Sequence, residues 1–226
     1  MKNIVKGVQP EELRRWKEVN SNVPENLAFG NLQADVKVPV REQMLNEQGF
    51  LCAYTMIRIA TVEECHIEHI IPQRQEPRSN QRDLDYENML ACFPGEHKPD
   101  GPQQYWSRKQ PYGAIFKDGK EVNDYNFVSP LQHDVEKRFI YDDFGGVSAM
   151  LEDEAAWSTI RILKLDHSIL NDLRKAAVNE VLQDVSSAEQ ARERAMLMMM
   201  CDWEGRLPEF CLVLSQSLNR LAEKMN

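Results

Sequence analysis

The chain has 226 residues, of which 42% are hydrophobic, so it can bury a core as one compact domain or two small ones. Its 27 basic and 36 acidic residues give a net charge of -9, which argues against a freestanding nucleic-acid binder, because such proteins neutralise phosphates with a basic face. No apolar run is long enough to cross a membrane and residues 1–6 lack the apolar part of a signal peptide, so we expect a cytoplasmic protein with no membrane partner.

The N-terminal segment is predicted to contain two helices. The first begins at Pro10, because proline suits a first helical position and the two acidic residues after it complement the helix dipole. The second covers residues 38–48 and ends at Gly49, which can adopt the left-handed conformation that follows many helices. Residues 50–55 are then expected to form a strand or a tight knuckle.

The middle of the chain combines one predicted strand with irregular structure. Residues 65–71 are apolar and β-favouring, and a proline stops the strand. Residues 73–84 are polar and are predicted to form a loop. Residues 85–91 are predicted to form a short helix with an aspartate cap. Residues 93–130 are rich in Gly, Pro, Asn and aromatic residues, which indicates an ordered, irregular segment with short strands.

The composition changes after about residue 130, and the rest of the chain is predicted to be a helical bundle. Four segments show helical apolar spacing: residues 152–165, 167–184, 188–202 and 208–225. We therefore expect two parts: N-terminal helices with the functional core over residues 1–130, and a helical region over residues 131–226 that docks a partner.

Glu68, His69, Asn88 and His97 occur in the order in which a ββα-metal nuclease presents its functional parts. An acidic residue and a histidine meet at a strand end, a loop with an asparagine follows, and a short helix carries the last metal ligand. An isolated acid–histidine pair at a strand end has little weight, but the complete order favours a nuclease. The sequence therefore predicts an α+β protein that is mainly helical, with an inserted ββα-metal (HNH) finger and a C-terminal helical bundle.

Each residue of this motif has a predicted task in phosphodiester hydrolysis, which needs a base for water and a cation for the developing charge. His69 is the predicted general base, because an imidazole pKa of about 6.5 suits neutral pH. Glu68 and His97 are predicted ligands of a divalent metal, Mg²⁺ with Mn²⁺ as the alternative. Asn88 is expected to organise the loop through hydrogen bonds to the backbone.

Seven blocks of the sequence extend the pattern beyond the motif: residues 47–54, 66–73, 86–92, 112–114, 129–131, 135–139 and 159–165. With these blocks the chain resembles the HNH endonucleases of the Septu (PtuB-type) and retron-associated anti-phage defence systems, over about residues 1–185. The resemblance implies an ABC/SMC-like ATPase partner (PtuA-type). In the retron version it also implies a reverse transcriptase with its RNA–DNA product.

The sequence departs from this family pattern in two places. Many HNH proteins fix the finger with two CxxC knuckles on zinc, but Thr55 and Gly95 stand where the second cysteines of Cys52 and Cys92 would be. We therefore expect packing to hold the finger without structural zinc, and the five cysteines to be reduced thiols. His97 stands one residue later than the usual spacing, so Glu96 is the substitute as last ligand.

Other residues near the motif keep two interpretations each. His66 is either an accessory ligand or phosphate contact, or it packs on the back of the strand. Contacts to nucleic acid are predicted for four basic side chains, with a solvated loop or a structural role as the alternative: Arg74, Arg78, Arg82 and Lys98.

The predicted function is thus that of a metal-dependent HNH endonuclease, the nuclease effector of an anti-phage defence complex. Its substrate is DNA or RNA, because this chemistry neither needs nor excludes a 2′-hydroxyl. The alternative is a non-catalytic scaffold or regulatory subunit with a vestigial HNH centre, which the missing knuckle cysteines and the acidic charge favour.

Overall fold

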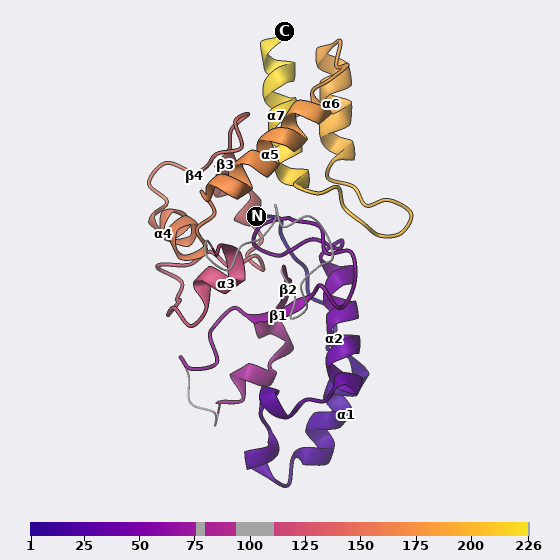
Figure 1. The fold of residues 1–226 in the computed structure, drawn as a ribbon, viewed down its shortest axis with the longest axis vertical. Helices are drawn as coiled ribbons and strands as arrows, with labels where there is room; N and C mark the ends of the chain where they lie inside the picture. The colour runs from indigo at the N-terminus through magenta and orange to yellow at the C-terminus, as the bar shows by residue number, and fades with distance from the viewer. Residues whose placement is uncertain (76–79, 94–110, 226) are drawn as a thin grey trace.

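A computed structural model describes residues 1–75, 80–93 and 111–225. These residues form an α+β structure of helices and two small antiparallel sheets (Figure 1). In the first sheet β1 (His66–His69) pairs with β2 (Met89–Cys92), and in the second β3 (Phe139–Tyr141) pairs with β4 (Val147–Ala149). Short 3₁₀ helices connect the elements: η1 (Pro24–Asn26), η2 (Phe29–Asn31), η4 (Arg82–Leu84), η5 (Tyr86–Asn88) and η7 (Val135–Lys137).

The two predicted N-terminal helices are present as α1 (Glu11–Asn20) and α2 (Ala34–Glu47), although both starting points differ from prediction. Pro10 is the residue before α1 rather than its first residue. The second helix begins before residue 38 and contains Pro39 inside it, where the proline lacks the N–H that would bond the carbonyl of residue 35. Gly49 ends it as expected, with φ +58, and a Cβ there would lie 2.7 Å from the side chain of Leu207.

For residues 50–55 the two predicted alternatives were a strand and a tight knuckle, and the structure has the knuckle. The only pairing there in the described parts of the chain is a single bridge between Leu51 and Arg58. Buried Gln48 joins this knuckle to β2: its amide donates to the carbonyls of Leu51 and Ala91, both at 2.8 Å, and its oxygen accepts from the N–H of Ala91 at 2.8 Å. The N–H of Ala53 also donates to the carbonyl of Ala91 at 3.0 Å, so both a polar side chain and the backbone hold the knuckle to this edge of the sheet.

The prediction of a helix over residues 85–91 is wrong beyond its first turn. Asp85 does cap a turn, because its carboxylate accepts from the N–H of Glu87 at 3.1 Å, but the turn is the short η5. The next four residues are strand β2, and all of them are buried. Burial on both faces, against β1 and the knuckle, overrides the local helical signal. Within residues 111–130 there is one short helix, α3 (Gly113–Lys117), and no strand.

Four helices follow residue 130 where helical spacing predicted them: α4 (Glu154–Leu163), α5 (Ser168–Val181), α6 (Ala188–Leu197) and α7 (Cys211–Lys224). Their packing is divided: α7 packs against α5 and α6, whereas α4 packs against α3 and β4. In Figure 1, α6 and α7 stand side by side at the end that carries the C-terminus, while β1 and β2 lie near the middle. The β3–β4 hairpin between these parts was not predicted.

One hydrophobic core contains residues from both expected parts of the chain, from Met1 to Leu214. The backbone also crosses between them, since the N–H of Phe210 donates to the carbonyl of Met56 at 3.1 Å. The division near residue 130 stays a prediction. In the described residues, none of the helices has the length and apolar character needed to span a bilayer.

Candidate active site

The end of β1 places the acid–histidine pair at a surface cleft. Glu68 and His69 are the last two residues of the strand, and they face Leu90 and Met89 of β2 in the antiparallel register. The cleft has a volume of about 620 Å³. Its walls come from η2, from β1 and the turn after it, and from α3 and the residues that follow it: Phe29, His66, Ile67, Glu68, His69, Pro72, Gln73, Arg74, Ala114, Ile115, Asp118 and Gly119.

Glu68 is held from inside the protein by a lysine that the sequence did not reveal. The ammonium of Lys117 donates to Glu68 Oε1 at 2.7 Å and to the backbone carbonyl of His69 at 2.8 Å. Lys117 is fully buried, and Glu68 is 7% exposed. Lys117 is the last residue of α3, where the helix dipole favours a cation. Helix α3 is the first helix described after β2, and it brings a cation to Glu68.

The second oxygen of Glu68 is directed toward His66. Residues two apart on a strand share a face, and His66 Nε2 lies 3.7 Å from Glu68 Oε2. The His66 side chain is 40% exposed and lines the cleft, so it does not pack on the back of the strand. A carboxylate oxygen and an imidazole nitrogen are donors that fit Mg²⁺ or Mn²⁺. Among the described residues, the side chains of Glu68 and His66 are therefore the two that could hold the predicted metal.

His69 is held as a neutral imidazole beside this pair. Its Nε2 lies 2.9 Å from the carbonyl oxygen of Asp83, which can only accept, so Nε2 carries the proton. Nδ1 then accepts from the side-chain amide of Gln73 at 3.2 Å. The ring is 6% exposed and meets the edge of Phe29, with centroids 4.7 Å apart. Burial lowers the pKa of His69, although the Asp83 carbonyl and the Glu68 charge act in the opposite direction. The lowered pKa favours the neutral form at pH 7.

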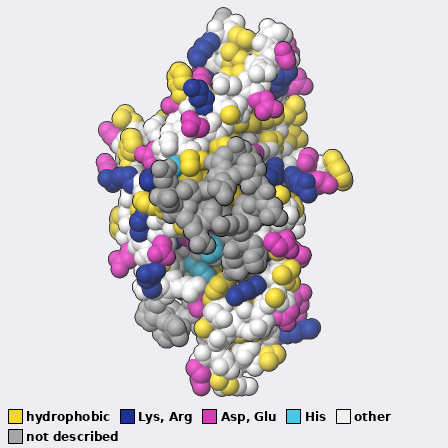
Figure 2. All heavy atoms as spheres, viewed as in Figure 1, with side chains coloured by type: hydrophobic (Ala, Val, Ile, Leu, Met, Phe, Trp, Pro, Cys, Tyr) yellow, Lys and Arg dark blue, Asp and Glu magenta, His cyan; other side chains and the backbone are white. Residues whose placement is uncertain are grey.

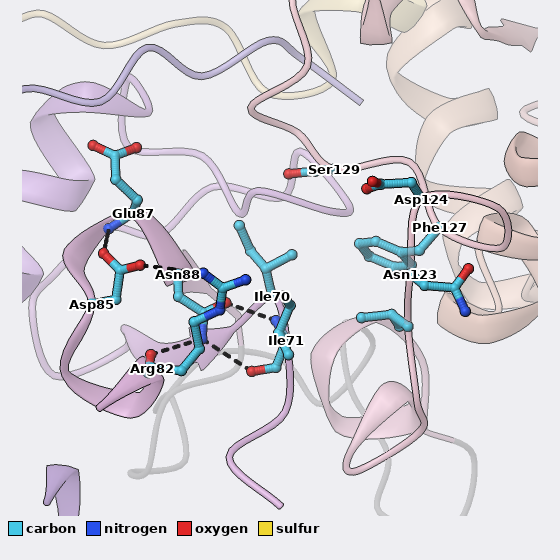
Figure 3. Close-up of a pocket in the computed structure, with 11 residues that line it drawn as sticks. Ile70, Ile71, Arg82, Asp85, Glu87, Asn88, Asn123, Asp124, Phe127 and Ser129 are labelled. Carbon is cyan, nitrogen blue, oxygen red and sulfur yellow. Dashed lines mark hydrogen bonds and ion pairs between the residues drawn. The ribbon is translucent and has the colours of Figure 1, made fainter. Parts of the chain in front are cut away.

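Asn88 connects the segments on either side of the loop. Its Oδ1 accepts from the N–H of Ile71 at 2.8 Å, and its Nδ2 donates to the carbonyls of Ile71 and Arg82, both at 3.0 Å (Figure 3). The side chain is 4% exposed. This is the backbone bracing expected of the residue. A smaller hollow of about 210 Å³ lies on this side of Asn88, bordered by Ile70, Phe127 and Ser129.

The predicted basic contacts are not all in one place. Arg74 borders the cleft of His69, and its guanidinium lies 3.2 Å from the carboxylate of Asp118. Arg82 borders the smaller hollow beside Asn88. Four predicted site residues lie outside the described residues: Arg78, Glu96, His97 and Lys98.

The knuckle places two thiols next to the sheet. Cys52 and Cys92 are both buried and reduced, and they hydrogen bond to one another. Burial would raise the pKa of Cys52, but hydrogen bonds from Cys92, Thr55 and the backbone outweigh it and lower that pKa to about 6. Among the described residues no group of three or more His, Cys, Asp or Glu side chains is placed to hold a metal ion. The expectation of a finger without zinc stays a prediction.

Acidic and basic side chains are interspersed over the described part of the face in Figure 2. A comparison of the sequence with protein-family models finds no match, and a comparison with curated proteins finds no match either. The function therefore has to be inferred from the residues of the site.

Proposed function

We propose that this protein is a metal-dependent HNH endonuclease that hydrolyses phosphodiester bonds with His69 as the general base. One observation carries the proposal: a neutral, oriented histidine and a carboxylate with one available oxygen line the same cleft at the end of β1. A general base must have a free lone pair near the reacting water, and the carboxylate must be ionised to hold a cation. The lone pair of His69 is on Nδ1, where water would take the place of the Gln73 amide now 3.2 Å away, and Glu68 directs Oε2 toward His66 at the cleft.

The residues of the site divide the chemistry between them. Nδ1 of His69 accepts a proton from water, while the Asp83 carbonyl stabilises the imidazolium that forms, because the bond at Nε2 is kept. Glu68 and His66 hold the divalent ion, with His97 as the predicted further ligand; when bound, the ion stabilises negative charge on the phosphate. Asn88 keeps the two loop segments at a fixed separation. Arg74, at the cleft edge, is placed to contact a phosphate.

The proposal includes a partner that delivers the substrate. With a net charge of -9 and both signs of charge spread over the face in Figure 2, the chain attracts a polyanion poorly. An ABC/SMC-like ATPase, as in the Septu and retron systems that the sequence resembles, supplies the missing basic surface. Met196, Met200 and Trp203 near the end of α6 are 65%, 60% and 92% exposed, and they offer an apolar surface for docking.

One observation favours the second candidate, a non-catalytic scaffold with a vestigial centre. The buried ammonium of Lys117 already neutralises Glu68 without any metal. An ion pair that satisfies the carboxylate in this way would suit a site that has lost its cation. The two candidates differ in whether a divalent ion binds through Glu68.

The deciding experiment replaces His69 with Ala and measures cleavage of DNA and of RNA, by the chain alone and with the proteins that co-elute with it. We expect a loss of about 10²-fold or more, because general-base catalysis contributes at least that much. His133→Ala, at an exposed histidine, is the matched control. Unchanged cleavage by a folded His69→Ala variant contradicts the nuclease proposal. Efficient cleavage by the lone chain at physiological salt contradicts the need for a partner.

A further inference from the structure

Lys117 is the one buried charge at the described site that the proposed chemistry does not use. Its ammonium reaches Glu68 Oε1 and the carbonyl of His69, at 2.7 and 2.8 Å, from a position with no solvent exposure. The cleft is lined by Glu68 and His66 but not by Lys117, so the lysine contacts the carboxylate from the side opposite to a bound ion. Its two contacts fix both residues of the acid–histidine pair.

We propose that Lys117 is a positioning residue that serves as a resident counter-cation for Glu68 and keeps the metal affinity of the free site low. The inference rests on the proposed function, because it assumes that Glu68 is a metal ligand. It differs from the scaffold alternative, because Lys117 occupies only Oε1 and leaves Oε2 beside His66.

The charges explain the expected effect. Glu68 and Lys117 together are neutral. A divalent ion at Oε2 therefore adds two positive charges, and the ion pair has no further described carboxylate to balance them. Repulsion between the ion and an ammonium on the same carboxylate is strong in a partly buried site. A phosphodiester brings negative charge of its own and offsets this repulsion. The site is therefore built to accept metal together with its substrate rather than before it.

The test measures Mn²⁺ binding by electron paramagnetic resonance, without substrate, for the wild type and for Lys117→Met. Methionine keeps the apolar stem and removes the charge, so we expect binding about tenfold tighter. The double variant Lys117→Met with Glu68→Gln should lose the gain. Lys117→Gln, which keeps a hydrogen-bond donor without the charge, is the second variant if methionine prevents folding, as checked by circular dichroism.

Lys6→Met is the matched control, because Lys6 is another buried lysine with one glutamate and one carbonyl partner, and it does not border the cleft. It should leave Mn²⁺ binding unchanged. Mn²⁺ binding through Glu68 in the wild type, with no gain in a folded Lys117 variant, overturns the counter-cation role and leaves the nuclease proposal standing. No Glu68-dependent binding in any variant overturns this role and the proposed metal site together.

Discussion

Two buried lysines each contact one member of a facing residue pair in the β1–β2 sheet. His69 and Met89 face each other in the register, and Lys117 donates to the carbonyl of His69 while Lys6 donates to the carbonyl of Met89 at 3.2 Å. Each lysine also pairs with a glutamate, Lys117 with Glu68 and Lys6 with Glu47 at 3.1 Å. The two regions are built alike, and they differ in what remains free on the carboxylate.

Both oxygens of Glu47 are fully used. Oε1 accepts from the N–H of Gly7 and from Gln43, both at 2.9 Å, and Oε2 accepts from the Tyr86 hydroxyl at 2.9 Å and from Lys6. In Glu68, by contrast, the one partner of Oε2 among the described residues is His66 at 3.7 Å, beyond hydrogen-bonding distance. A buried carboxylate with every acceptor satisfied serves the fold, whereas one with a free acceptor at a cleft can serve a ligand.

The largest effect should come from breaking the saturated pair. Glu47→Ala leaves the ammonium of Lys6 buried and unpaired, with a side-chain exposure of only 3%. We expect the free energy of unfolding to fall by about 3 kcal/mol, as for other buried ion pairs that lose one partner. Urea denaturation measures the change. Glu18→Ala, in the exposed helical pair with Arg14, is the control and should cost at most about 0.5 kcal/mol. Equal losses in the two variants would show that the Glu47 network has no special role.

A smaller loss should follow from removing the brace at the loop. Asn88→Ala leaves the N–H of Ile71 and the carbonyls of Ile71 and Arg82 without these partners. We expect about 2 kcal/mol of destabilisation, because several buried groups lose hydrogen bonds but no charge is uncovered. Hydrogen exchange should accelerate at Ile70 and Ile71 more than in α7. A uniform acceleration across both segments would mean that Asn88 supports the whole fold rather than the loop.

The sequence alone was enough to select the site residues that lie close together along the chain, but not the one that is distant in sequence. Glu68, His69 and Asn88 could be selected because their order and the strand before Pro72 are local features. Lys117 could not, because it reaches Glu68 over 49 positions only after α3 has folded across β1. No motif surrounds it, and a lysine at a helix end is normally solvated.

Secondary structure follows the same division. Helices after residue 130 have continuous amphipathic spacing, and this local property is enough to predict them. Strand β2 was mistaken for a helix because its pairing is decided by β1 and by Gln48, both distant in sequence. The β3–β4 hairpin did leave a signal, an aromatic and β-branched run over residues 139–141 followed by Gly145 with φ +83.

The contrast between structural and functional groups also holds for two buried histidines. Burial lowers the pKa of both His69 and His167, so both are neutral at pH 7. In His69 the acceptor nitrogen accepts from the side-chain amide of Gln73 at 3.2 Å, a partner that itself lines the cleft. In His167 the acceptor is used by the fold, since Nδ1 caps α5 by accepting from the N–H of Ile169 at 3.1 Å.

The smallest effect should come from His167→Asn, and it should be seen in how the free energy of unfolding depends on pH. Asparagine can keep the cap, and the loss of the buried ring beside Tyr112 should cost the same at every pH, so the change with pH isolates the titration. Because burial and the charge of Lys164 lower the pKa of His167 in the folded state, the unfolded chain binds its proton more readily. Wild-type stability should therefore fall as the pH drops below the unfolded value of 6.5, and level off below the folded pKa.

The variant should lack this contribution, and its stability relative to the wild type should improve on acidification. Urea denaturation of both proteins at about pH 8 and about pH 5.5 measures the difference. His133→Asn, at an exposed histidine, is the control and should change neither value. If the wild type and His167→Asn keep the same difference at both pH values, His167 titrates alike in the folded and unfolded chains. Its Nδ1 would then not be the cap of α5, because a protonated ring cannot accept the Ile169 hydrogen bond and a positive charge at a helix N-terminus is unfavourable.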